Sequence, residues 1–176
     1  MNEFSRPFRL DSLSGEPRQV RIEAGPAERE ALAIRFGLAG VEALAAESQL
    51  SRRGEVVEAA GRLRASVTQS CIATAEPVAA SLEEVFRVEF RPPPEGRAED
   101  EIELGEEELD VVFHDGGAID LGEAVAQTLA LALDPYPRSP AAEAALREAG
   151  VKSEEEARAE ASPFAALKGL KGKLEE

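Results

Sequence analysis

The chain contains one cysteine, Cys71, and one histidine, His114, and these two residues form its only candidate nucleophile–base pair. Covalent catalysis needs such a pair within hydrogen-bond reach, with a further group that orients the base. Cys71 and His114 lie at the ends of different predicted strands, so the sequence leaves their spatial approach open. An isolated cysteine in a strand is more often a small core residue, and a histidine before Asp-Gly-Gly is typical of a turn. We therefore predict that the protein is not an enzyme.

Other motifs that carry chemistry are missing from the sequence or have the wrong spacing. The chain has no dinucleotide-binding fingerprint, nucleophile elbow or zinc-binding helix motif. The segment Gly169-Leu-Lys-Gly-Lys173 superficially resembles a phosphate-binding loop, but its spacing is wrong and no Ser or Thr follows the lysine. Carboxylates are frequent between Glu95 and Asp110, yet they lack the ligand spacing of an EF-hand, and a solvated loop is the better interpretation. We predict no cofactor and no bound metal.

Four arginines could gather on the polar face of a predicted hairpin and contact a partner. They are Arg52, Arg53, Arg62 and Arg64. One interpretation is a contact with RNA phosphates, and the other is charge balance against Glu55 and Glu58 across the strand pair. The sheet lacks the aromatic side chains on which readers of single-stranded RNA stack bases. The sequence favours the structural role and leaves direct contact with RNA open.

The charge of the chain is unevenly distributed. Residues 1–91 carry 12 Arg against 14 Asp and Glu, a net charge of −2, whereas residues 92–176 carry 8 basic against 21 acidic side chains, a net charge of −13. Nucleic-acid binding normally rests on Lys and Arg contacts to phosphates, so this balance argues against DNA as a partner. Acidic chains suit basic partners, among them ribosomal proteins. The alternative is that acidity only keeps the protein soluble.

Composition predicts one domain with a solvated appendage, in the cytoplasm. Hydrophobic residues make up 43% of the chain and charged residues 31%, respectively just below and above the globular norm. No apolar run approaches the ~20 residues of a membrane span. The N-terminus has no apolar core of a signal peptide. A single cysteine excludes an internal disulfide framework and fits a reducing compartment.

Hydrophobic alternation predicts strands near the N-terminus. Residues 19–23 alternate cleanly, with Val20 and Ile22 on one face. Residues 4–10 alternate loosely, and Pro7 restricts them to an edge strand because proline cannot donate a ladder hydrogen bond.

A helix is predicted over residues 27–37, with Pro26 at its opening, where a missing N–H is harmless. Its apolar stripe is expected to consist of Ala27, Ala31, Ile34 and Leu38. The next segment, residues 41–50, could be helical or extended. We predict a strand, because glycine and a turn-like Arg-Arg-Gly bracket a strand-length run.

The central region, residues 53–90, has the clearest strand pattern. Residues 56–69 alternate between small apolar side chains and polar ones, which is typical of a half-buried antiparallel strand, with a bulge or kink expected at Gly61. A turn follows at residues 74–77, and residues 82–90 form the next strand. Three consecutive prolines, residues 92–94, end it.

The second half begins with an acidic loop over residues 92–108, which is too polar to bury. A strand over residues 109–113 and a helix over residues 121–133 follow, and Asp120 with Glu123 forms a capping-box-like start. The apolar stripe of this helix is expected to consist of Leu121, Val125, Leu129 and Ala132, with Leu133 beside them.

Together these elements predict an α+β fold, with an antiparallel sheet of sandwich or barrel-like form and two packed helices. Residues 1–138 are expected to form the core domain, and residues 139–176 an acidic, marginally helical tail. The tail ends in a short apolar and basic stretch that we interpret as a docking motif. Its candidate contact residues are Phe164, Leu167, Lys168, Leu170 and Lys171.

Three sets of residues in this chain occur in an order that carries a family resemblance. They are Gly61-Arg-Leu-Arg-Ala-Ser-Val-Thr-Gln-Ser-Cys71 with Thr74 and Glu76-Pro-Val78; Ile119-Asp-Leu-Gly-Glu123 leading into Leu129-Ala-Leu-Ala-Leu133-Asp-Pro135; and Ser162-Pro-Phe-Ala-Ala-Leu167 with lysines close behind. This ordered set resembles the YceD family of bacterial large-subunit (23S) ribosomal RNA accumulation proteins, and it spans most of the chain.

The resemblance implies a cytoplasmic, non-catalytic protein that 23S rRNA needs in order to accumulate, and hence a role in large-subunit synthesis. Genes of this family often neighbour that of a small large-subunit ribosomal protein, which makes a ribosomal protein a plausible partner. Many members carry Cys-x-x-Cys where this chain has Cys71 and Thr74, and some carry a further cysteine downstream. Because both partner thiols are missing here, a four-cysteine zinc site is not available.

Two functions therefore follow from the sequence. The first is an assembly factor that binds a ribosomal protein or a pre-large-subunit particle through the acidic half and the tail. The second is a small-molecule or regulatory binding module with a pocket in its sheet.

Overall fold

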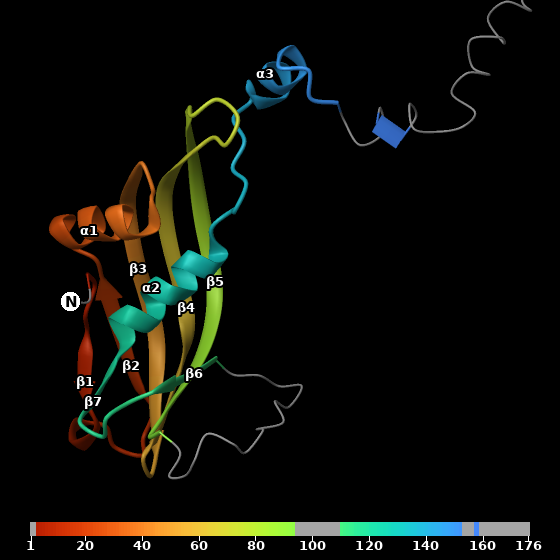
Figure 1. Ribbon diagram of the computed structural model, residues 1–176. Coiled ribbons are helices and arrows are strands. Elements are labelled where there is room, and N and C mark those ends of the chain that lie inside the picture. The colour runs from red at the N-terminus through yellow and green to blue at the C-terminus, as the bar shows by residue number, and fades with distance from the viewer. Residues whose placement is uncertain (1–2, 94–109, 153–156, 159–176) are drawn as a thin grey trace, which may run out of the picture.

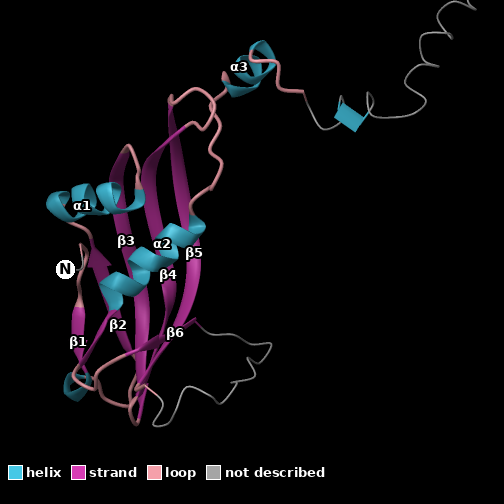
Figure 2. Cartoon of the chain, in the orientation of Figure 1, coloured by secondary structure: helices cyan, strands magenta, loops and turns pink. Residues whose placement is uncertain are grey.

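Figure 1 shows the computed structural model of the chain, which describes residues 3–93, 110–152 and 157–158. The main element of the fold is an open five-stranded sheet in the order β2-β3-β4-β5-β6, and a smaller sheet pairs β1 with β7. Helices accompany the sheets (Figure 2), so the fold is α+β as predicted. The elements are β1 (Pro7–Arg9), a short 3-10 helix (Leu10–Ser12), β2 (Arg18–Glu23), α1 (Pro26–Phe36), β3 (Gly40–Arg53), β4 (Val56–Ser70), β5 (Pro77–Arg91), β6 (Asp110–Phe113), β7 (Ala118–Asp120), α2 (Leu121–Ala132) and α3 (Ala142–Glu148).

The three long strands β3, β4 and β5 form the centre of the sheet as two consecutive antiparallel hairpins. Along β4, Leu63 and Val67 are buried, whereas Arg62 and Arg64 are exposed, which confirms the predicted alternation. The ambiguous segment 41–50 is indeed extended. β5 begins earlier than the sequence predicted, because it stays paired with β4 down to the turn.

Gly61 lies where β3 passes very close to β4. A Cβ atom at this position would lie 2.2 Å from the main-chain oxygen of Glu47, so only glycine fits. The expected bulge at Gly61 is wrong, because the register runs through it unchanged. A register shift occurs instead between Val41 and Ala43.

The helix α2 crosses one face of the sheet diagonally, in front of β3 and β4 and toward β5 (Figure 1). We call this the inner face. Its predicted apolar stripe is confirmed at Leu121, Val125 and Leu129, which are fully buried. The stripe packs against the inner side chains of the central strands, which include Leu63, Val67, Phe86, Val88 and Phe90.

The helix α1 packs on β3 through a different face from the predicted one. Leu32 and Ala33 are buried, whereas Ala27 is exposed and Ile34 is 78% exposed. Alanines occur on several sides of this helix, so its apolar periodicity alone could not determine which side faces the sheet. Gly37 ends α1 in the left-handed conformation, with φ 64°.

The sheet is mixed and open rather than antiparallel and barrel-like. The pairs β2–β3, β3–β4 and β4–β5 are antiparallel as predicted, and β6 alone pairs parallel to its neighbour, beside Val88–Arg91 of β5. The connection between these strands, residues 92–109, has the length that a crossover to a parallel neighbour requires. β2 and β6 are the two edges of the five-stranded sheet, so it does not close into a barrel.

Beyond α2 the chain continues to α3, in the region predicted to be helix-prone. Ser139 and Ala142 are buried, although the sequence placed both in the tail. Residues 94–108 of the predicted acidic loop and the whole docking motif, residues 162–174, lie outside the described residues.

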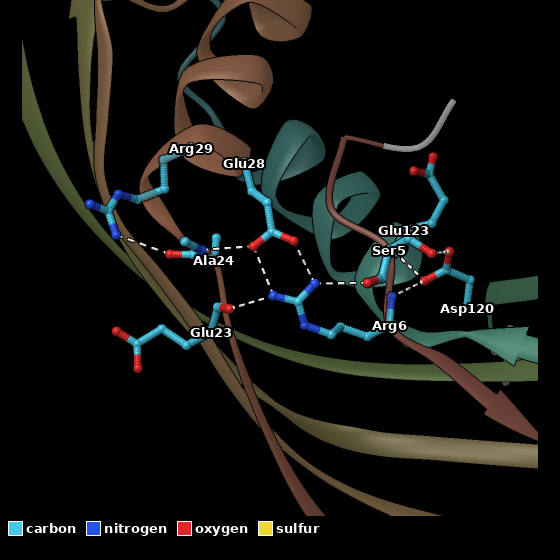
Figure 3. Close-up of polar contacts among 9 residues, drawn as sticks. Ser5, Arg6, Glu23, Ala24, Glu28, Arg29, Asp120 and Glu123 are labelled. Atoms are coloured by element: carbon cyan, nitrogen blue, oxygen red, sulfur yellow. Dashed lines mark hydrogen bonds and ion pairs between the residues drawn. The ribbon is translucent and has the colours of Figure 1, made fainter.

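The N-terminal segment is fastened to the start of α2 by Asp120 (Figure 3). Its carboxylate caps the helix by accepting from the main-chain N–H of Glu123 at 3.2 Å. It also accepts from the Ser5 hydroxyl at 2.6 Å and from the main-chain N–H of Arg6 at 2.8 Å. One carboxylate therefore fixes both the helix and the segment that crosses it.

The side chain of Arg6 continues this connection toward α1 (Figure 3). Its guanidinium binds both carboxylate oxygens of Glu28, at 2.5 and 2.8 Å, and donates to the main-chain oxygen of Glu23 at 2.8 Å. The Arg6 guanidinium lowers the pKa of the Glu28 carboxyl. The N-terminal segment thus joins α1, β2 and α2.

Gly122 permits the close contact between α2 and this segment. A Cβ atom at Gly122 would lie 2.3 Å from the main-chain oxygen of Phe4. We expect Gly122→Ala to lower the free energy of unfolding by about 2 kcal/mol, because the main chain of Phe4 would have to move. In a helix without this contact, the same substitution would be stabilising.

Chemical denaturation measures this effect, with Gly15→Ala as the control. A Cβ atom at Gly15 would meet no atom within 4 Å, so the control should unfold as the wild type does. Equal stability of Gly122→Ala and wild type would show that the N-terminal segment does not lie against α2.

Candidate functional site

Cys71 lies in a polar cluster where the turn after β4 meets the segment that follows α2. The main-chain N–H of Cys71 donates to the main-chain oxygen of Glu76 at 2.8 Å. The hydroxyl of Ser139 donates to the Glu76 carboxylate at 2.6 Å, and the Thr74 hydroxyl lies 3.0 Å from the same oxygen. We call Cys71, Thr74, Glu76 and Ser139 the Cys71 cluster.

Hydrogen-bond donors around the sulfur stabilise the thiolate of Cys71. The main-chain N–H of Ser139 contributes most, followed by the Thr74 hydroxyl, and together they lower the pKa of the Cys71 thiol to about 6 although burial opposes them. The Ser139 hydroxyl likewise lowers the pKa of the Glu76 carboxyl. The sulfur is buried, so a reactive thiolate here would have little access to a substrate.

The cluster lacks the ligands of a metal site. It offers one thiol, one carboxylate and two hydroxyls, whereas structural zinc takes four thiolate or imidazole ligands. Nowhere in the described part of the chain do three or more His, Cys, Asp or Glu side chains lie close enough to hold a metal ion. Thr74, which stands where many relatives carry a second cysteine, is a hydrogen-bond partner of Cys71.

His114 lies at the other end of β4 and cannot pair with Cys71. Its Nε2 atom lies 2.8 Å from the main-chain oxygen of Glu55, which directly precedes β4, whereas Cys71 directly follows it. A strand of 15 residues spans about 50 Å at the usual rise per residue. The structure therefore excludes a Cys71–His114 dyad.

The imidazole of His114 instead joins two turns. Nε2 must carry the proton that it donates to the Glu55 carbonyl, because that oxygen can only accept. Nδ1 accepts from the main-chain N–H of Gly116 at 3.0 Å. Both ring nitrogens of this buried histidine are engaged in holding the chain together.

The four arginines singled out in the sequence lie in two separate pairs. Arg62 and Arg64 are exposed on β4 and share one carboxylate, that of Glu83 on β5, at 2.7 and 3.2 Å. The Glu83 carboxylate raises the pKa of Arg64. The sequence predicted that Glu58 would balance the charge of these arginines. This is wrong, because Glu58 pairs with Arg87 at 2.7 Å.

The second pair, Arg52 and Arg53, lies about 20 Å away at the turn between β3 and β4. Arg52 donates to the main-chain oxygens of Gly54, at 2.7 Å, and Leu10. It therefore fastens this turn to the short N-terminal helix. Arg53 is exposed beside it.

The face of the sheet opposite α2, which we call the outer face, carries an open hollow of about 560 Å³ over Gly61. Its lining combines polar side chains, among them Gln19, Arg21, Glu47 and Arg62, with small or apolar ones, among them Ala45, Ala60 and Val85. Pockets that hold small molecules are concave, mainly apolar and enclose most of the ligand. This hollow is open to solvent and would leave much of a ligand exposed, so its geometry does not favour the small-molecule function.

Ser139 is the cluster residue that the sequence did not reveal. It lies 63 positions from Glu76, and only the course of α2 across the sheet brings the two together. No local spacing could have signalled this contact. The residues of the docking motif, Phe164, Leu167, Lys168, Leu170 and Lys171, lie outside the described residues.

The fold and these contacts define a small, acidic α+β protein whose polar clusters fasten its elements to one another. The model of the YceD family, described as large ribosomal RNA subunit accumulation protein YceD, matches residues 59–171. The chain therefore belongs to this family, which confirms the resemblance seen in the sequence. No curated protein and no solved structure gives a significant match.

The family description gives the chain a role in the accumulation of the RNA of the large ribosomal subunit. None of the described helices is long and apolar enough to cross a membrane.

The low pKa of Cys71 predicts a stability that depends on pH. Because the thiol pKa is about 6 in the folded chain and about 8.5 in an unfolded one, the thiolate stabilises the fold fully above pH ~8.5. This contribution is lost as the pH falls toward 6. The difference in melting temperature between the wild type and Cys71→Ser should therefore grow as the pH rises from about 6 to about 8.5.

Ultraviolet absorbance of the thiolate gives a direct measurement, with Cys71→Ser as the blank. We expect a midpoint near pH 6 in the folded protein and near pH 8.5 in denaturant. A midpoint near 8.5 in the folded protein would contradict the donor arrangement around the sulfur.

Proposed function

We propose that this protein is a non-catalytic factor in large-subunit synthesis that binds a basic ribosomal protein or a pre-large-subunit particle. The main support for this proposal is the family match over residues 59–171 in a chain whose net charge is −15. The match points to large-subunit synthesis as the process, and the negative charge points to a basic partner. Both observations support a binding role, which we propose takes place in the cytoplasm, where ribosomes are assembled.

The charge distribution favours protein over RNA as the direct contact. Residues 92–176 alone carry a net charge of −13, which repels phosphates and attracts Lys- and Arg-rich surfaces. The exposed arginines of β4 already share Glu83, which neutralises part of their charge. Ion pairs of this exposed kind contribute little to stability, about 0–1 kcal/mol.

We further propose two candidate contact regions besides the acidic surface. The first is the docking motif, in which apolar residues alternate with lysines: Phe164, Leu167, Lys168, Leu170 and Lys171. The second is formed by the arginines, of which Arg53 is the most open to a partner at the β3–β4 turn, while Arg52, Arg62 and Arg64 already bind groups of this chain.

Non-catalytic action is supported by the position of the two residues that could have formed a nucleophile and a base. Cys71 and His114 lie at opposite ends of β4, and both have hydrogen-bonding roles within the fold.

Sedimentation of a cell lysate tests the proposed function. We expect a fraction of the protein to migrate with pre-large-subunit particles at low salt and to leave them at high salt, because charge attraction is screened. Protein that remains wholly at the top of the gradient at low salt would contradict an assembly function.

Removal of residues 162–176 tests the docking motif within the same experiment. We expect the particle-bound fraction to fall about tenfold, which corresponds to about 1.4 kcal/mol of binding free energy, while the melting temperature stays the same. Leu167→Ser with Leu170→Ser should reproduce this loss, and Glu175→Ser is the matched control. A large fall in melting temperature after truncation would show that the segment belongs to the core.

A further inference from the structure

β5 has no neighbouring strand along more than half of one side. β4 pairs with it throughout Pro77–Phe90, but on the other side β6 pairs only with Val88–Arg91. Among the described residues, no main-chain hydrogen bond from another segment reaches residues 77–87 on this side. We call residues 77–87 on this side the free edge of β5.

The register shows which main-chain groups point away from β4. The main-chain N–H of Cys71 donates to the main-chain oxygen of Glu76, so these two residues form a hydrogen-bonded pair. In an antiparallel ladder such pairs recur at every second residue, which extends the pattern along β4 and β5. The even-numbered residues of β5 therefore face β4. In agreement, the carbonyl of Arg91 points to the opposite side, where it accepts from the N–H of His114 at 2.9 Å.

The groups presented at the free edge are thus those of alternate residues, Ala79, Ser81, Glu83 and Val85. Pro77 fits the same alternation, because a proline is tolerated where the missing N–H faces away from the ladder. An extended peptide could pair with this row of donors and acceptors, which is the way in which strand addition achieves affinity.

Side chains next to the free edge offer the alternation that an added strand requires. On the inner face, Val78, Ala80 and Leu82 are half-buried and form an apolar shelf. On the outer face, Val85 is 73% exposed. Alternate side chains of an added strand would meet the shelf on one side and the outer face on the other.

The charge at the free edge indicates the character of its occupant. Glu84 lies in the middle of the edge and Glu76 beyond its end, and both side chains are exposed. Glu83 is exposed as well, but its carboxylate is already shared by Arg62 and Arg64. Charged side chains and a proline on an edge strand discourage pairing with a second copy of the same chain. A net charge of −15 on each copy opposes such pairing further.

We propose that the free edge of β5 binds an extended, Lys- or Arg-rich segment of a partner protein as an added strand. The segment's main chain pairs with Ala79, Ser81, Glu83 and Val85, and its basic side chains lie near Glu84 and Glu76. This inference rests on the proposed function, since it assigns the site at which a basic ribosomal protein binds. Nucleic acid cannot form such a ladder, because it lacks a peptide main chain.

Amide hydrogen exchange of the free, full-length chain is the first test. We expect fast exchange at Ala79, Ser81, Glu83 and Val85, and slow exchange at the intervening residues, whose N–H groups bond to β4. Slow exchange at both sets would show that another part of this chain, or a second copy, already occupies the edge. That result would overturn the proposal.

Proline substitution at Ser81 is the second test, with Ser81→Ala as its matched control. Both variants remove the exposed hydroxyl, but only Ser81→Pro removes an edge N–H, and neither removes a bond to β4. We expect Ser81→Pro to lower the particle-bound fraction about tenfold in the sedimentation experiment, and Ser81→Ala to leave it unchanged. Ala79→Pro should act as Ser81→Pro does, which provides a second variant should one of them fold poorly.

The outcomes separate the two proposals. If the wild type, Ser81→Pro and Ala79→Pro all migrate with particles, the free edge is not the binding site, while the assembly function stands. If the wild type itself stays at the top of the gradient, the assembly function fails, and the edge proposal fails with it.

Discussion

The packing of α2 across the inner face of the sheet is the contact on which the rest of the structure depends. At its beginning, Asp120 caps the helix and binds the N-terminal segment, and Gly122 lets that segment approach. In its middle, Val125 and Leu129 cover the apolar side of the central strands. Beyond the end of α2, the chain reaches the turn after β4, where Ser139 binds Glu76 in the Cys71 cluster.

The sequence predicts the parts of the fold that are governed by local pattern. The alternation of β4 and the Asp120 cap are visible in the sequence because each depends on neighbours a few residues away. The predicted packing face of α1 is wrong, since Ile34 is exposed. Alanines lie on several sides of this helix, so its sequence does not show which side faces the sheet. The parallel direction of β6 and the contact of Ser139 with Glu76 depend on how distant segments meet, which no local pattern encodes. For the same reason the possible Cys71–His114 pair could be judged only from the course of β4.

The positions of the ionisable side chains with shifted pKa values fit a binding protein better than an enzyme. The side chains with shifted pKa values, among them Cys71, Glu28 and Glu123, owe those shifts to contacts that hold elements together. A perturbed pKa marks structural networks as well as catalytic sites. Within the described part of the chain, α2 covers the inner face, whereas no element covers the outer face or pairs with the free edge of β5. A strongly acidic chain with an open strand edge is suited to a basic, extended partner.

The central claim is that the protein supports the accumulation of large-subunit RNA by binding and without catalysis. The most direct measurement is the ratio of large-subunit to small-subunit ribosomal RNA in cells depleted of the protein and supplied with either the wild type or Cys71→Ala. Our account predicts that depletion lowers the ratio and that Cys71→Ala restores it as fully as the wild type does. A ratio that does not change on depletion, or a folded Cys71→Ala variant that fails to restore it, would contradict the account.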